Sequence, residues 1–525
     1  MNNEAKNDFQ IGVECFVEAN RKYWEKTKEP ASGDGWIYVL HTLHHEFTPS
    51  VLEDIVAKGV QEKEHLPIAS VISGRADDLM ELMDQVDASF GIEQRFHQSY
   101  YDYSNEVIEE LAEKMASDTY GNKDGLIGLT YRGVRFGDSL YDDILRRGNN
   151  RKRGNIFDCF EISQGRYCKF IRNALAIIDQ AYELFEKRKP SYLVTTEYFY
   201  TKGLYAHVAC ALGAKILITA VEYSDIIIQV DPNKHQLSDV KVADTKCAQI
   251  GICLQKYLDE DMYDENLFVR EVKSNKKVSI SQEWNGKKNV FILPHAFGDA
   301  PREAFRHNIY HDYREWFSDT LRIVRDIPGI NWIVKDHPYS SYYGQEDYVR
   351  SVFEQYKTEN LHWLDKEHSG MDIKDFADCI LTCAGDAGIE YWAYGIPTIT
   401  VCDTHYGRWG ISYEIKSLNE YERVLKDIQS VNAPPQESVE LARRWLNTSK
   451  NWHRQSDNFA KLIRKYYLED EMIWKTSGVH YGIRDLVDQQ LGKNVRGFCE
   501  SFATLLSRND LKSWPIFQLN NLVEI

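Results

Sequence analysis

Long hydrophobic runs and a leader-like N-terminus are both missing from this 525-residue sequence. No run of about 18 or more apolar residues occurs, which argues against a transmembrane helix. The first ten residues, MNNEAKNDFQ, contain no basic segment followed by an apolar run. We therefore expect no signal peptide and a cytoplasmic location.

Paired cysteines and an excess of basic residues are missing as well. The ten cysteines are scattered without any C-x-x-C pair, which favours reduced thiols in a cytosolic protein. The formal net charge is −17. Nucleic-acid-binding proteins need a basic face, so this charge argues against a nucleic-acid partner.

Three common motifs of nucleotide and hydrolase chemistry are absent. The sequence has no Walker A loop, no G-x-G-x-x-G after its first expected strand, and no G-x-S-x-G elbow. His41, His44, His45 and Glu46 follow that first strand and could ligate a metal ion. They lack the spacing that would place them on one helix face, so no metal site is predicted.

Strand-like and helical segments alternate along most of the chain, which predicts parallel sheets. The expected strands are 36–40, 66–73, 192–196, 215–219, 289–293, 331–334, 361–364, 380–382 and 398–401. The sequence thus predicts an α/β protein of two Rossmann-like, doubly wound domains that face each other across a cleft, with extra C-terminal helices.

A polar stretch of weak pattern separates the two sets of strands and sets the expected domain boundaries. The first domain is expected over 1–272, a linker over 273–288, the second domain over 289–470 and a helical extension over 471–525.

The most informative stretch is 379–402, CILTCAGDAGIEYWAYGIPTITVC. It predicts a buried strand, a glycine turn, a short helix and a second strand. Gly385 and Gly388 would let the backbone approach a phosphate at the helix start, and Glu390 could reach ribose hydroxyls. The alternative is an ordinary strand–turn–helix crossover whose glycines only satisfy packing.

Two other strands of the second half also end in polar residues. One strand is followed by His295 and Asp299, and the next by Lys335, His337 and two serines, Ser340 and Ser341. The carboxyl ends of parallel strands meet at one edge of a sheet, so these residues and the glycine turn can converge on one ligand. Cationic and hydroxyl donors are suited to phosphate.

Several segments of the second half resemble a known family. They are PHAFGDAP (294–301), DYREWFSDTLRIV (312–324), WIVKDHP (332–338), GDAGIEYWAYGIPTIT (385–400) and Tyr406-Gly407. They look like bacterial capsular and surface-polysaccharide glycosyltransferases of the GT-B fold, which share a Lys-x-His-Pro motif with the capsule Kdo transferases. In the first half, YRGVRFGDSLYDD (131–143) and the strand that ends at Glu197 look similar more loosely.

The resemblance implies a role for each matched residue. Lys335 and His337 would bind the donor phosphate, Gly385 and Gly388 would let the helix start approach it, and Glu390 would bind the ribose. His295 and Asp299 would line the site near the donor sugar. The family usually needs no metal and no cofactor beyond its nucleotide-sugar donor, here CMP-, UDP- or GDP-linked. Asp386 departs from the small hydroxyl residue that many relatives carry after the glycine.

The first domain would then bind the acceptor and supply the general base. Asp138 and Glu197 are the favoured bases, with His41, His44 or His45 as the alternative. The expected function is sugar transfer to a capsular or lipopolysaccharide glycan or a glycolipid acceptor, with the protein bound peripherally at the cytoplasmic face of the inner membrane beside other polysaccharide-assembly enzymes. The alternatives are a teichoic-acid-type polyol-phosphate transferase with a CDP-linked donor, and an inactive GT-B-like scaffold.

Overall fold

The computed structural model divides the chain into two compact units. Unit 1 contains residues 1–140, 163–240 and 452–525, and unit 2 contains residues 141–162 and 241–451. Within these bounds the structure describes residues 3–24, 33–42, 47–73, 78–92, 94–100, 103, 105–148, 158–256, 284, 286–337, 340, 345–364, 373–455, 461–466, 484–507, 514 and 516–525.

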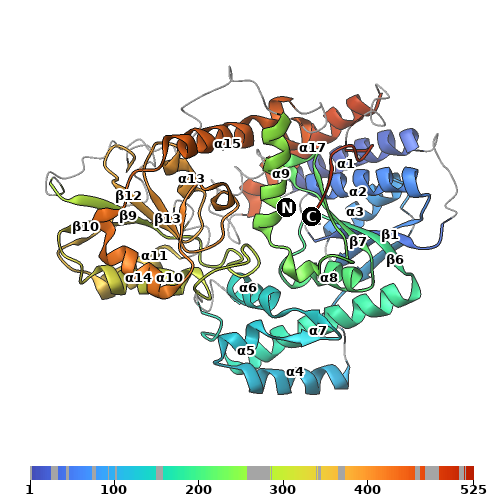
Figure 1. Ribbon diagram of the computed structural model, residues 1–525. Coiled ribbons are helices and arrows are strands. Elements are labelled where there is room, and N and C mark those ends of the chain that lie inside the picture. Colours follow the sequence, from blue (N-terminus) through green and yellow to red (C-terminus); the bar gives the residue numbers. More distant parts are fainter. Residues whose placement is uncertain are drawn as a thin grey trace. The chain divides into compact units, whose positions relative to one another are not determined.

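Unit 1 is built around a seven-stranded sheet (Figure 1). Its strands are β1 (Trp36–His41), β2 (Ile68–Ser73), β3 (Gln94–Gln98), β6 (Pro190–Thr195), β7 (Lys215–Ile218), β8 (Ile227–Val230) and β15 (Leu522–Glu524). Their order is β15-β8-β7-β6-β1-β2-β3, and every neighbouring pair is parallel except β7–β8. The strand order reverses between β1 and β6, which makes that pair the switch point of the sheet.

The helices of unit 1 connect and cover these strands. They are α1 (Asn3–Trp24), α2 (Phe47–Glu64), α3 (Asp78–Ser89), α4 (Glu106–Thr119), α5 (Lys123–Ile127), α7 (Gln164–Lys187), α8 (Leu204–Ala211) and α17 (Arg484–Ser507). A two-stranded ribbon, β4 (Thr130–Tyr131) and β5 (Val134–Arg135), precedes α6 (Gly137–Gly148), within which the boundary between the units falls.

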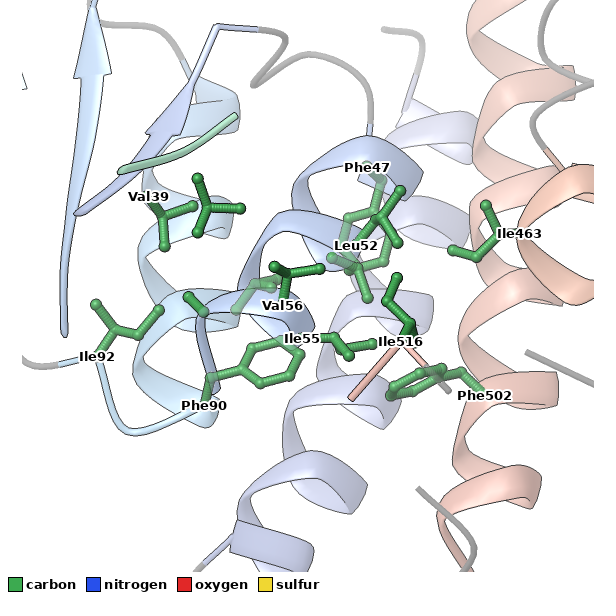
Figure 2. Close-up of a cluster of buried hydrophobic side chains, with 14 of the residues drawn as sticks. Val39, Phe47, Leu52, Ile55, Val56, Phe90, Ile92, Ile463, Phe502 and Ile516 are labelled. Carbon is green, nitrogen blue, oxygen red and sulfur yellow. The ribbon is translucent and has the colours of Figure 1, made fainter. Parts of the chain in front are cut away.

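The main core of unit 1 joins the two ends of the chain. Helix α1 packs against α17, and the rings of Phe16 and Phe502 stack with centroids 4.9 Å apart. Figure 2 shows Phe502 and Ile516 beside Ile55 of α2. Burial of these apolar side chains is therefore what brings the C-terminal residues back to the first sheet.

Unit 2 contains a six-stranded sheet in which every pair is parallel. Its strands are β9 (Lys288–Leu293), β10 (Ile330–Lys335), β11 (Leu361–Leu364), β12 (Cys379–Thr382), β13 (Thr398–Thr400) and β14 (Tyr413–Glu414). The order β11-β10-β9-β12-β13-β14 is that of a dinucleotide-binding Rossmann sheet, with its switch point between β9 and β12. Together with the first sheet, it confirms the predicted α/β class with two Rossmann-like domains.

The helices of unit 2 pack on this sheet around a separate core. They are α9 (Val242–Lys256), α10 (Tyr313–Val324), α11 (Glu346–Tyr356), α13 (Ala387–Trp392), α14 (Leu418–Lys426) and the start of α15 (Gln436–Gln455). Trp316 and Trp332, on α10 and β10, are fully buried in that core.

The units do not coincide with the expected domain boundaries. Residues 141–162 and 241–256 lie with unit 2, although both were expected in the first domain. The reason for the first is a set of buried contacts. Tyr141 donates a hydrogen bond of 2.5 Å to Asp312, and the Asp142 carboxylate accepts the backbone N–H of Glu303 at 2.8 Å.

The C-terminal end was expected as a separate helical extension over 471–525, and its described part packs on the first sheet instead. Strand β15 pairs with β8 and α17 packs on α1, so both belong to unit 1. Most of the expected linker, namely 273–283 and residue 285, lies outside the described residues. The arrangement of the two domains across a cleft stays a prediction.

Two sequence-based expectations can be compared with the described residues directly. None of the helices described is both long and apolar enough to cross a membrane. All ten cysteines are free thiols; seven are buried, two are half-buried, and Cys15 is exposed.

The packing of the C-terminal helix generates a testable expectation. We expect Phe502→Ala to lower the free energy of unfolding of unit 1 by about 3–5 kcal/mol, because it removes a fully buried ring from the core. Urea unfolding followed by far-UV circular dichroism measures the change. Val107→Ala, on an α4 position that is 67% exposed, is the control and should cost less than about 0.5 kcal/mol. Equal stability of the two variants would show that the C-terminal helix is not part of this core.

Candidate functional site

The candidate site lies at the switch point of the unit 2 sheet, where β9 and β12 end side by side. His295 follows β9, and Gly385 follows β12. A Cβ atom built on Gly385 would lie 3.7 Å from His295 Cδ2, so the imidazole packs against the glycine turn. In open α/β sheets ligands bind at this position.

The end of β10 approaches the same place. The His295 ring stacks on Tyr313 with centroids 4.2 Å apart. The centroid of the His337 ring lies 6.2 Å from that of His295, with 30° between the two ring planes. Gln345 holds the strand end, because its amide donates to the His295 carbonyl at 3.1 Å and accepts from the Phe297 N–H at 2.8 Å. The fold therefore brings together polar residues from all three predicted strand ends.

Lys335, the last residue of β10, is the buried cation of this edge. Its side chain is 8% exposed, and the ammonium donates to the Asp336 carbonyl at 3.4 Å. Burial lowers the pKa of Lys335 to about 8, although the charge of Asp336 acts in the opposite direction. The amine therefore remains mostly protonated at neutral pH but loses its proton far more easily than an exposed lysine.

Of the two predicted serines, the structure describes Ser340. Ser340 is fully buried, and its backbone N–H donates to the His337 carbonyl at 3.0 Å. Its hydroxyl has no hydrogen-bond partner among the residues that the structure describes. Ser341 lies outside the described residues. Asp299 is half-exposed, with Arg146 of the same unit 3.6 Å away.

Packing requires one of the two glycines in the turn after β12. Neither Gly385 nor Gly388 has a positive φ. A Cβ on Gly388 would lie 2.1 Å from the Tyr406 hydroxyl, which donates to the Gly385 carbonyl at 2.8 Å. The packing alternative thus explains Gly388, whereas Gly385 faces His295. Glu390 is buried on the short helix α13, with its N–H bonded to the Asp386 carbonyl at 3.1 Å.

Two residues near this turn were missed by the sequence reasoning. Lys246 Nζ of α9 and His405 Nε2 each lie 3.4 Å from Asp386 Oδ1. The acid that departs from the family pattern therefore faces a cation and an imidazole. Burial, reinforced by the charge of Lys246, lowers the pKa of His405 to about 3, so this ring is neutral. The sequence could have indicated His405, because it closely follows the strand β13, whose carboxyl end lies at the same sheet edge. No motif or strand end in the sequence indicates Lys246.

The residues proposed as bases all belong to unit 1. Asp138 lies in the first turn of α6, with its carboxylate 3.9 Å from Arg135. Glu197 follows β6 and is half-buried, and its carbonyl accepts the Thr195 hydroxyl at 3.0 Å. His41 ends β1 and is fully buried among carboxylates. His44, His45 and Glu46 lie outside the described residues.

The close approach at Gly388 can be tested by stability. We expect Gly388→Ala to cost about 1–3 kcal/mol, because the added methyl group meets the Tyr406 ring. In a Tyr406→Ala background the same change should cost far less, and thermal unfolding of the four proteins measures this coupling. Gly165→Ala in α7 is the control, since nothing lies within 4 Å of its Cβ position. An additive double variant would contradict the packing explanation.

Comparisons with known proteins find similarity only among solved structures. No family model and no curated protein matches the chain. A UDP-N-acetylglucosamine 2-epimerase matches at 12% identity over 86% of this chain and 98% of its own, with a TM-score of 0.24. The KpsC beta Kdo 2,4 transferase of Thermosulfurimonas dismutans matches at 14% identity over 49% and 79%, with a TM-score of 0.28. The spinosyn rhamnosyltransferase SpnG matches at 11% identity over 82% and 100%, with a TM-score of 0.24. Scores this low carry no argument about function, and the fold assignment stands on the two sheet orders.

Proposed function

We propose that this protein is a glycosyltransferase that moves a sugar from a nucleotide-sugar donor to a surface-glycan acceptor. The observation that supports it most is the meeting of His295, His337 and Gly385 at the switch point of the unit 2 sheet. Lys335 and His337 of the Lys-x-His-Pro segment, and the G-x-E segment, lie at this same edge, and both segments resemble surface-polysaccharide glycosyltransferases.

The charges of the edge are suited to a nucleotide phosphate. Lys335 supplies a nearly buried positive charge, and the His337 imidazole lies at the same edge, 6.2 Å from the His295 ring. Burial lowers the pKa of His295, so this ring is neutral and acts as a packing surface or a hydrogen-bond partner rather than as a cation. An anion that binds here would receive charge-assisted hydrogen bonds, which are stronger than neutral ones.

In the proposed reaction, an acceptor hydroxyl attacks the anomeric carbon of the donor sugar. The new carbon–oxygen bond forms as the bond to the leaving phosphate breaks, and the nucleotide carries away that electron pair. Lys335 and His337 would stabilise the leaving phosphate, Ser340 and Ser341 would bind it by hydrogen bonds, and Glu390 would bind the ribose. His295 and Asp299 would lie near the sugar. Asp138 or Glu197 of unit 1 would take the proton of the acceptor hydroxyl.

The phosphate-binding role predicts the behaviour of two variants. His337→Ala and Lys335→Met should each weaken nucleotide binding by about 10- to 100-fold, because each removes a hydrogen bond to a charged group. Isothermal titration with CMP, CDP, UDP and GDP measures the affinity for each nucleotide and identifies the nucleobase that the protein prefers. Lys426→Met, which changes an exposed lysine of the same unit, is the matched control.

Two outcomes of that titration would count against the proposal. Wild-type affinity in both variants would place the nucleotide elsewhere, and no binding of any nucleotide would favour an inactive scaffold. Transfer from CDP-glycerol, with no transfer from nucleotide sugars, would favour the polyol-phosphate alternative.

The lowered pKa of Lys335 also predicts a pH dependence. The protonated amine binds phosphate, so affinity should be nearly full about one pH unit below the pKa of about 8 and fall up to tenfold per pH unit above it. Lys335→Arg should move this loss beyond pH 10, because guanidinium stays protonated. Titrations between pH 7 and 10 measure the effect, and a flat wild-type profile would show that Lys335 does not contact the phosphate.

A further inference from the structure

A second polar cluster lies at the switch point of the unit 1 sheet. It consists of His41 at the end of β1, Glu53 and Asp54 on α2, and Asp87 on α3. None of these four side chains is more than 1% exposed. Buried charged groups are normally paired with opposite charges or with a metal ion.

Three side chains of the cluster point polar atoms at one another but form no hydrogen bonds through those atoms. His41 Nε2 lies 3.3 Å from Asp87 Oδ1 and 3.6 Å from Asp54 Oδ1. Within the described part of the chain, neither that nitrogen, nor Asp87 Oδ1, nor either oxygen of Asp54 has a hydrogen-bond partner. Ligand atoms of the three residues all lie within 4.8 Å of one another.

The other polar atoms of these side chains are held by hydrogen bonds. His41 Nδ1 lies 2.8 Å from Glu53 Oε2, and Glu53 Oε1 accepts the Thr196 N–H at 2.6 Å. The Ser70 hydroxyl donates to Asp87 Oδ2. A proton on Nδ1, donated to Glu53, leaves a lone pair on His41 Nε2. A carboxylate behind a ligating histidine is the usual outer support of a metal site.

These observations favour a cation. Around an ion with bonds of about 2.1 Å, tetrahedral ligand atoms lie about 3.4 Å apart, close to the two spacings from His41 Nε2. We propose that His41, Asp54 and Asp87 bind a divalent transition-metal ion such as Zn²⁺, with Glu53 and Ser70 orienting the ligands.

The charge of the cluster identifies the competitor of a metal ion. It contains three carboxyl groups and a single imidazole, so His41 can balance at most one negative charge. Bound protons are therefore the alternative to a divalent cation at this site.

The metal would hold together one edge of the first sheet. Its ligands come from β1, α2 and α3, and Glu53 links them to β6 through Thr196. Glu197, the next residue, is a candidate base of the proposed reaction. The ion would thus be structural, and the proposal does not depend on the identity of the nucleotide donor.

The test uses the full-length protein, stripped with a chelator and then titrated with Zn²⁺. We expect one tightly bound ion per chain and a rise in melting temperature of about 5 °C at 100-fold excess over the dissociation constant. Cobalt substitution should give a spectrum without a thiolate charge-transfer band, which separates this site from the ten cysteines.

Two variants make the experiment decisive. Asp54→Asn resembles the protonated carboxyl, so it should fold without metal but lose at least 100-fold in Zn²⁺ affinity. His97→Ala is the matched control, because His97 forms an exposed pair at 2.9 Å with Asp84 of α3, the helix that carries Asp87. This variant should bind Zn²⁺ as the wild type does. Unchanged binding in Asp54→Asn would overturn the proposal. So would a failure of the wild type to bind Zn²⁺, Mn²⁺, Fe²⁺ or Co²⁺, and the cluster would then be held by protons alone.

Discussion

The direction of parallel strands is the constraint on which the rest of this structure depends. When neighbouring strands run the same way, their carboxyl ends lie at one edge, and the chain must leave that edge through loops. Where the strand order reverses, the loops diverge and leave room for polar side chains. Both sheets of this protein have such a reversal, between β1 and β6 and between β9 and β12.

The two reversals carry different chemistry on the same framework. In unit 2 the edge holds a lysine of lowered pKa, stacked imidazoles and a glycine turn, an arrangement that can receive an anion. In unit 1 the edge holds three buried carboxylates around His41, and a cation bound there would balance their negative charge. Burial of apolar side chains stabilises both sheets. In unit 1, the N-terminal helix α1 packs against the C-terminal helix α17 in the same core.

Much of the fold could be predicted from the sequence because its strands are continuous apolar runs bounded by turn residues. The strand ends at His295, His337 and Gly385 were placed together because parallel topology requires it. The partners of Asp386 were not foreseen, since Lys246 comes from a helix in a stretch of weak pattern. The His41 cluster was also missed. Its ligands are separated along the chain and meet only when α2 and α3 pack on the sheet, so no local spacing indicates them.

The central claim is that a nucleotide phosphate binds at the carboxyl edge of the second sheet. A crystal structure of the protein with a bound nucleoside diphosphate tests this most directly. The account predicts phosphate oxygens within about 3 Å of Lys335 Nζ and of the His337 ring, with the ribose toward Glu390. A diphosphate bound away from the ends of β9, β10 and β12 would contradict it.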